Sequence, residues 1–522
     1  MVFTSLKFIL FITATVIIYF LFPKKYRWVW LLLSSYFFYL SASIKYGVFL
    51  VFSTAVTFSA AVLMEKLTEK ADISSLSKEE RKQAKKRLQK RKKLIVAFAV
   101  ILNFAVLFLI KYYNFTVLNI SALAGVFGIE FSPVLSSLLL PVGISFYTFQ
   151  VTGYVIDVYR GISGAERNFF KYALFVSYFP QIMQGPIGRF SQLSETLYYG
   201  HAFEYERMTR GIQRMMFGFF EKLVIADRLA IAVDTVWAQY SSYGRIELIL
   251  ACIFYAIQIY ADFAGYMDIA LGASEIMGIR LSENFKAPYF SASVPEFWRR
   301  WHITLGSWFR DYLFYPVMRS GWCSKLGKFI KEKFGKKLSG KVTTVIALMC
   351  VWFFTGMWHG ASWHYIIWGV YYGILIILST LLAPVFDGFV QKHSIDRSKP
   401  LYKSVQILKT FALVCLGYIF FRSTGMTQAF GIIGRIFSVS APLNSPAGIG
   451  LDKADLLVAL IAVAVLIITD IYRAKEVDIR EAVAAKPLVL RWAVYFILLF
   501  SVIIFGVYGP GYSSSSFIYF QF

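Results

Sequence analysis

Cysteine and histidine are both scarce in this chain, and neither residue type forms a pattern that marks a metal site. The 522 residues include four cysteines and five histidines. The cysteines lie far apart, without the spacing of a disulfide framework or a zinc site. The sequence also lacks a Ser-His-Asp arrangement and a glycine motif that cradles phosphate. We therefore expect neither a bound metal ion nor a resident cofactor.

Long polar stretches are missing too, so the sequence contains no separate soluble domain. Hydrophobic residues make up 58% of the chain, against about 45–50% in a soluble domain. Apolar runs recur from end to end, and about 20 helical residues span a bilayer. We predict one all-α polytopic membrane domain over residues 1–522, with roughly eleven to thirteen membrane segments, some broken or re-entrant. The clearest runs are Phe8–Phe22, Trp28–Ala42, Gly47–Met64, Leu94–Ile110, Leu248–Ile259, Val342–Met357, Trp363–Leu382, Gln406–Phe421, Leu456–Thr469 and Trp492–Val507.

Acidic residues are outnumbered by basic ones, 30 to 54, which gives a net charge of +24. Two stretches hold much of this excess: residues 65–93 carry twelve basic and five acidic residues, and residues 296–341 carry eleven and three. Basic loops mark the cytoplasmic face, so we place both stretches inside and both termini outside. Nucleic-acid binding is disfavoured because no recognised binding module accompanies the charge. Within the first stretch, Ser77 and Glu80 predict a capping box that opens a charged helix.

His359 is the ionisable group that stands out. It follows the apolar run Val342–Met357, which predicts a membrane helix, and lies in the segment Gly356–Trp363. An ionisable side chain at membrane depth is costly unless it has a function, and histidine transfers protons near neutral pH. The alternative is a hydrogen-bonded packing histidine. Of the others, His364 is expected in an interfacial aromatic belt, and His201 and His393 on polar surfaces.

Two further clusters contain groups capable of chemistry. Asp262 and Asp268 lie six residues apart in an apolar helix, where they either line a polar path or pair with the backbone or with arginine for packing. The second cluster begins at Asn284 and continues through Glu296–Tyr312. There, aromatic and basic residues at helical spacing predict an amphipathic helix in the cytoplasmic interface. Arg299, Arg300 and His302 on that helix can also receive an anionic acyl carrier.

Several motifs together resemble the membrane-bound O-acyltransferase family, and within it the branch that acetylates bacterial alginate. The motifs occur in the family's order, and the resemblance runs from Leu6 to Phe522. They are Leu140–Gln150, Tyr178–Ile187, Asp262–Asp268, Phe297–His302, Trp358–Ala361 and Phe517–Phe522. The resemblance implies a fold whose helices enclose a cavity that passes through the membrane.

The resemblance also implies roles for particular residues. His359, in the Trp-His-Gly motif, corresponds to the catalytic histidine of the family. His302 corresponds to the second family histidine, and we expect it to position the acyl donor or to orient His359. The residues expected to bind substrate are Trp298, Arg299, Arg300, Asp262, Asp268, Asn284 and Gln184.

The expected reaction is acyl transfer from a cytoplasmic thioester, acetyl-CoA, to a polysaccharide outside a bacterial plasma membrane. A neutral imidazole can accept the proton of a hydroxyl as that hydroxyl attacks the thioester. The resemblance implies an exported or membrane-anchored partner protein that completes the transfer. Two alternatives stay open: D-alanyl transfer to teichoic acid, and a transporter of polysaccharide or lipid-linked sugar without acyl chemistry.

Overall fold

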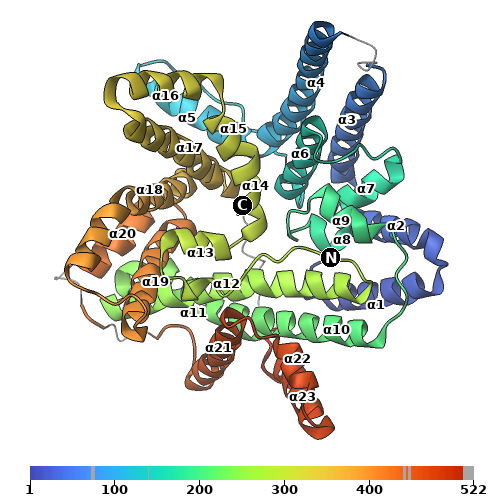
Figure 1. The fold of residues 1–522 in the computed structure, drawn as a ribbon. Helices are drawn as coiled ribbons and strands as arrows, with labels where there is room; N and C mark the ends of the chain where they lie inside the picture. The colour runs from blue at the N-terminus through green and yellow to red at the C-terminus, as the bar shows by residue number, and fades with distance from the viewer. Residues whose placement is uncertain (72–76, 139, 439–441, 445–447, 509–522) are drawn as a thin grey trace. The chain divides into compact units, whose positions relative to one another are not determined.

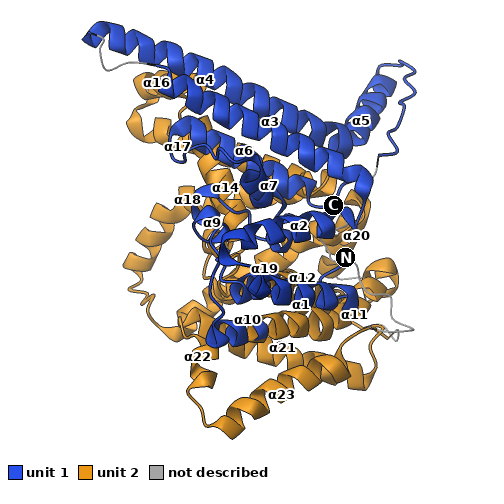
Figure 2. Ribbon diagram, turned by 90° about the vertical axis from the view of Figure 1, so that its right-hand side faces the viewer, with its two compact units in different colours: residues 1–212, 270–282 blue, residues 213–269, 283–522 orange. Residues whose placement is uncertain are grey.

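The computed structural model describes residues 1–71, 77–138, 140–438, 442–444 and 448–508, and in these ranges every regular element is a helix (Figure 1). The predicted all-α class is therefore confirmed. The tail Phe517–Phe522, and with it the predicted outer C-terminus, lies outside the described residues. The chain forms two compact units, residues 1–212 with 270–282 and residues 213–269 with 283–522 (Figure 2). Because the units interleave along the sequence, neither is a separable stretch of chain, and the single domain stays a prediction.

The first unit is built around α6, almost all of which is buried. This helix packs against α3, α4 and α7. The helices of this unit that follow residue 168 are short. Frequent Pro and Gly residues in that region interrupt longer helices. The helices of this unit are α1 (Leu6–Leu21), α2 (Arg27–Leu40), α3 (Ile44–Glu69), α4 (Lys78–Leu107), α5 (Tyr113–Val126), α6 (Ile144–Arg160), α7 (Phe169–Ser177), α8 (Phe179–Ile182) and α9 (Phe190–Leu197).

The second unit contains the long hairpin of α17 and α18, with α19 packed on α18 and with α13 against both α18 and α19. The unit boundary falls within α10 (Tyr205–Phe219) and α12 (Arg245–Ile276). The other helices are η3 (Phe220–Ala226), α11 (Asp227–Ala238), η4 (Tyr240–Ser242), η5 (Pro288–Phe290), α13 (Val294–Arg300), α14 (Ile303–Phe309), η6 (Arg310–Phe314), α15 (Tyr315–Met318), α16 (Gly321–Phe334), α17 (Lys336–His359), α18 (Trp363–Lys392), α19 (Pro400–Arg422), α20 (Met426–Phe437), α21 (Lys453–Ala474), α22 (Ile479–Ala484) and α23 (Leu488–Phe505).

Eight helical stretches of the described chain are long and apolar enough to cross a membrane. They are α3, the continuous stretch Lys78–Val126, α12, α17, α18, α19, α21 and α23. The sequence count of eleven to thirteen also included shorter runs, which here form α1 with 16 residues and α2 with 14. Chains of this kind are multi-pass membrane proteins.

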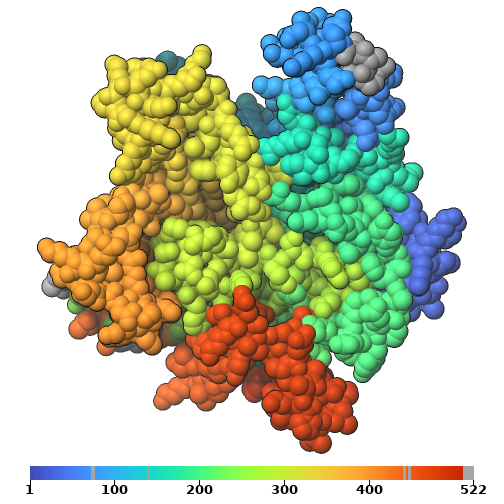
Figure 3. Space-filling view, in the orientation of Figure 1, coloured from blue at the N-terminus to red at the C-terminus, as the bar shows by residue number. Residues whose placement is uncertain are grey.

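Helix α23 lies within the red region of Figure 3, and most of its large apolar side chains are exposed. Val489 is 83% exposed and Ile497 is 69% exposed, which suits a helix whose side chains face lipid rather than water. The predicted capping box is also present: Ser77 accepts a hydrogen bond from the amide of Glu80, and the Glu80 carboxylate accepts one from the amide of Ser77. The charged helix α4 therefore begins at Lys78, as its sequence predicts.

Candidate active site

The predicted membrane helix over Val342–Met357 is confirmed as part of α17, whose last residue is His359. Gly360 follows in an extended conformation, and α18 starts at Trp363. A Cβ at Gly360 would lie 2.3 Å from the ring of Tyr365, so this tight turn leaves no room for a side chain there. The turn holds His359 at the end of the hairpin.

Two glycines let α17 and α18 approach each other closely. A Cβ at Gly369 would lie 2.2 Å from the carbonyl oxygen of Trp352, and a Cβ at Gly356 would lie 2.4 Å from that of Tyr365. Real Cβ atoms do not come this near to a backbone oxygen. The backbones therefore pack without side chains between them, which fixes the position of His359 against α18.

Aromatic rings enclose His359, which is only 3% exposed. Ring centroids of Trp358, Trp368 and Phe421 lie 4.9, 4.8 and 5.1 Å from the imidazole, each in an edge-to-face arrangement. Trp368 is 2% exposed, and its indole N–H has no hydrogen-bond partner among the described residues. Buried indole N–H groups usually find an acceptor, so this donor is an exception within the described residues.

His302 lies in the same unit, where Glu296–Tyr312 does not form the single amphipathic helix that we expected. That expectation is wrong: the chain breaks between α13 and α14, with His302 in the left-handed region at φ 47°. The break turns the imidazole inward, where it is 2% exposed and meets Phe263 edge-to-face at 4.8 Å. Burial lowers the pKa of His302 to about 3, so the ring is neutral at physiological pH.

The two histidines approach the same side chain. The ring of Trp358 lies 5.9 Å from His302 and 4.9 Å from His359, centroid to centroid. The structure thus brings together two residues that are 57 positions apart in the sequence.

Asn284 holds the start of α14 beside His302. Its Oδ1 accepts hydrogen bonds from the amide of Thr304 at 3.1 Å and from the Thr304 hydroxyl at 2.7 Å. Its carbonyl oxygen accepts a third from the amide of Ile303. His302 occupies the N-cap position without a side-chain cap bond. Asn284 therefore acts as the cap from a distant segment.

The remaining predicted residues of this region lie on α13. Trp298 packs edge-to-face on Trp352, Trp368 and Tyr372, with centroids 4.7, 5.5 and 4.8 Å away. Arg299 is exposed. Arg300 pairs with Glu296 one turn earlier at 2.6 Å.

Asp262 lies in a buried ion triad. The ammonium group of Lys222 is 2.7 Å from Asp262 and 2.7 Å from Asp227, and all three side chains are nearly inaccessible. The ammonium is paired with both carboxylates, and removal of one partner from a buried pair costs about 3–5 kcal/mol. The triad joins α12 to η3 and α11.

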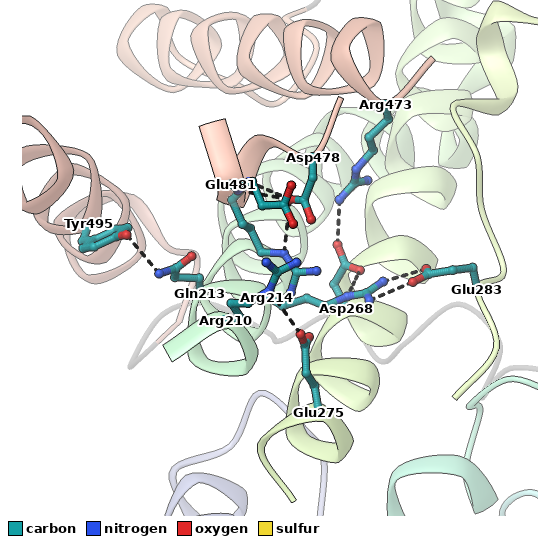
Figure 4. A network of polar contacts seen from close by, with 11 residues as sticks. Arg210, Gln213, Arg214, Asp268, Glu275, Glu283, Arg473, Asp478, Glu481 and Tyr495 are labelled. Carbon is teal, nitrogen blue, oxygen red and sulfur yellow. Dashed lines mark hydrogen bonds and ion pairs between the residues drawn. The ribbon is translucent and has the colours of Figure 1, made fainter. Parts of the chain in front are cut away.

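Asp268 lies in a larger ionic network, drawn in Figure 4. Its two oxygens receive Arg214 and Arg473, each at 2.9 Å, and Arg214 also forms a bidentate pair with Glu283. Both predicted carboxylates are therefore held by cations of this chain. Lys222, Arg214 and Arg473 could not be recognised from the sequence, because their partners Asp262 and Asp268 are distant along the chain.

A profile of the membrane-bound O-acyltransferase family matches residues 164–419, which include both histidines. A probable alginate O-acetylase AlgI from Pseudomonas putida is 34% identical over 438 residues, 80% of this chain and 82% of the relative. The chain belongs to the membrane-bound O-acyltransferase family. It is thus an O-acyltransferase of the membrane.

Other relatives have names that state different activities. A peptidoglycan O-acetyltransferase from Helicobacter pylori is 28% identical over 439 residues, covering 79% of this chain and 73% of the relative. A teichoic acid D-alanyltransferase from Streptococcus thermophilus is 30% identical over 304 residues, covering 55% and 69%. Similarity to this O-acyltransferase family therefore extends across several acceptors.

Gln184 is the one predicted site residue of this O-acyltransferase that lies in the first unit. It follows α8, is 2% exposed, and neither end of its amide has a hydrogen-bond partner within the described ranges. Nothing in the structure tests its assignment to substrate, which stays a prediction together with those of the α13 residues.

Two other histidines, His364 and His393, form side-chain hydrogen bonds of their own. His364 is 6% exposed, and its Nδ1 lies 2.8 Å from the hydroxyl of Ser362, whereas the adjacent Trp363 is 53% exposed. His393 is exposed at the end of α18, with Nδ1 2.9 Å from the carbonyl oxygen of Phe389. His393 therefore offers a matched control for His359.

Proposed function

We propose that this chain transfers an acetyl group from cytoplasmic acetyl-CoA to hydroxyl groups of a polysaccharide outside a bacterial plasma membrane. The observation that carries the proposal is the position of His359, buried among aromatic rings at the end of α17 and adjoining the ring shared with His302. The O-acetylase names of two relatives favour acetate as the acyl group.

His359 acts as the general base. Its neutral imidazole accepts the proton of the acceptor hydroxyl while the hydroxyl oxygen bonds to the thioester carbonyl carbon. The C–S bond then breaks, and the departing thiolate takes the proton back from the imidazolium. A positioned base of this kind contributes about 10²–10⁴ in rate.

Trp368 supplies a hydrogen bond to the carbonyl oxygen of the acyl group as negative charge develops there. Its N–H is buried, and the centroid of its ring lies 4.8 Å from that of the His359 imidazole. A preorganised donor in an apolar site stabilises such charge more than water does. His302 stays neutral and orients His359 through Trp358.

Charged and polar side chains outside the two histidines bind the acyl donor and the acceptor. The exposed guanidinium of Arg299 and the neighbouring Arg300 and Trp298 receive the phosphates and adenine of the donor at the cytoplasmic face. Asn284 supports His302 in the same region. Gln184 offers a buried amide to the acceptor, and Asp262 and Asp268 keep the polar interior in place.

The direction of transfer follows from charge. The basic segments 65–93 and 296–341 lie inside by the positive-inside rule, and both termini lie outside. Donor and acceptor are then on opposite sides of the membrane, so helices must enclose a path through it. An exported or membrane-anchored acetyltransferase partner completes the transfer to polymer.

The experiment is ester analysis of surface polymer from a deletion strain and from the same strain complemented with the wild-type gene. Acetate that returns with the gene supports the proposal. Return of ester-linked D-alanine would replace it with the teichoic-acid reaction, which the Streptococcus thermophilus relative favours. Unchanged esters with altered polymer export would overturn acyl transfer and leave a transporter.

A further inference from the structure

A groove of ≈ 600 Å³ lies between α17 and α18, near the start of α17. It is lined by three lysines, by small or hydroxyl side chains and by aliphatic ones. The lining residues are Lys336, Lys337, Gly340, Lys341, Thr344, Val345, Leu348, Ile377, Thr380 and Leu381. The groove belongs to neither histidine nor to the ionic network of Asp268.

The groove is charged at one end only. Its lysines occupy the first turns of α17, and its aliphatic residues Val345 and Leu348 follow one to three turns deeper on the same face. At 1.5 Å per residue, the lining from Lys336 to Leu348 extends about 18 Å along the helix axis. That length matches a headgroup with the upper part of an acyl chain.

No acidic residue lines the groove. The hairpin of α17 and α18 has one acid, Asp387, which is not among the lining residues and pairs with Arg397 at 2.6 Å. The two helices that form the groove, α17 and α18, are each long and apolar enough to cross a membrane. A ligand for this groove must therefore carry negative charge beside the lysines and an aliphatic chain beside Leu348 and Ile377.

We propose that the groove binds one anionic phospholipid, with its phosphate on the lysines and an acyl chain along the aliphatic residues. Basic pockets between membrane helices on the cytoplasmic side hold anionic headgroups in this way. A soluble phosphate compound would satisfy the lysines but would leave the aliphatic half of the groove without a partner. The lipid thereby occupies the hairpin that carries His359 at its far end.

The test measures photocrosslinking of a phosphatidylglycerol probe to purified protein in detergent micelles, with a phosphatidylcholine probe beside it. The triple variant Lys336→Gln, Lys337→Gln, Lys341→Gln should lower phosphatidylglycerol labelling by about 100-fold at low salt, since each lysine contributes about 1 kcal/mol near a membrane surface. A matched triple variant on α16, Lys325→Gln, Lys328→Gln, Lys331→Gln, removes the same charge and should keep the labelling.

A second variant separates shape from charge. Thr344→Trp fills the groove without changing its charge and should also lower labelling. Equal labelling by both lipids, equal loss in the two triple variants, or displacement of the lipid by coenzyme A would overturn the proposal. These readouts need no acyl transfer, so their failure is distinguishable from failure of the proposed function.

Discussion

His302 and His359 contact the same indole ring, that of Trp358, from segments that are far apart in the sequence. Both imidazoles are nearly inaccessible to solvent. In the proposed mechanism, a displacement of His302 reaches His359 through this ring, so that one histidine acts as the base and the other positions it.

The neutral state of His302 gives a stability prediction. Its pKa is about 3 in the folded protein and near the ordinary histidine value of 6.5 when unfolded, so acid protonates the unfolded chain first. The stability that depends on the neutral ring is complete above pH 6.5 and falls as pH decreases toward 3. We expect His302→Gln to lessen this fall in thermal unfolding measured from about pH 7 to about pH 4. Identical slopes for both proteins would contradict a buried neutral ring.

Asn284 should matter for both stability and catalysis. Asn284→Ala removes the acceptor for two donors of Thr304, and loss of a cap costs about 0.5–2 kcal/mol. Thr304→Val removes only the hydroxyl bond and should cost less. Thermal unfolding and kcat should rank the variants in that order. Wild-type kcat in Asn284→Ala would show that the cap does not position His302.

Gly369 tests the close approach of α17 and α18. Gly369→Ala places a Cβ 2.2 Å from the carbonyl oxygen of Trp352, and such overpacking costs about 1–3 kcal/mol. Gly388, in the same helix, has no heavy atom within 4 Å of a built Cβ, so Gly388→Ala should be neutral or stabilising by up to about 1 kcal/mol. The measurement is the melting temperature of each variant and of the wild type in detergent. Equal values for both variants would mean that the hairpin is looser than described.

The indole N–H of Trp368 should affect turnover rather than stability alone. Loss of one such donor lowers kcat by about 10²–10³. Trp368→Phe, and the isosteric replacement of this tryptophan by benzothienylalanine, should both lower kcat with little change in KM. Trp237 is equally buried with an N–H that likewise lacks a partner in the described chain. Trp237→Phe should therefore lower stability and leave kcat unchanged. Full activity in both Trp368 variants would exclude the indole N–H as the proposed hydrogen-bond donor.

The local features of this fold could be predicted from the sequence. Apolar length predicts α17 and α18, and the Ser77–Glu80 capping box predicts where α4 begins, because each depends on neighbouring residues only. The break at His302 could not be predicted this way. The periodicity of Glu296–Tyr312 favours one helix, whereas burial of the His302 ring against Phe263 requires two.

In the candidate site, too, some features could be predicted from the sequence and others depend on tertiary packing. The resemblance to a family identified His359 and His302, but the ring that joins them follows from tertiary packing. Asp268 pairs with Arg214 from α10 and with Arg473 from α21. No spacing rule connects residues that far apart, so their charges gave no signal in the sequence.

The most direct test of the account is the amount of ester-linked acetate on surface polymer per molecule of protein, in wild type and in His359→Ala. We expect His359→Ala to insert at wild-type levels and to lose acetate by about 10²–10⁴-fold, the contribution of a general base. His393→Ala, which changes an exposed histidine, should match wild type. Wild-type acetate in His359→Ala at equal protein level would contradict the central claim that this imidazole is the base.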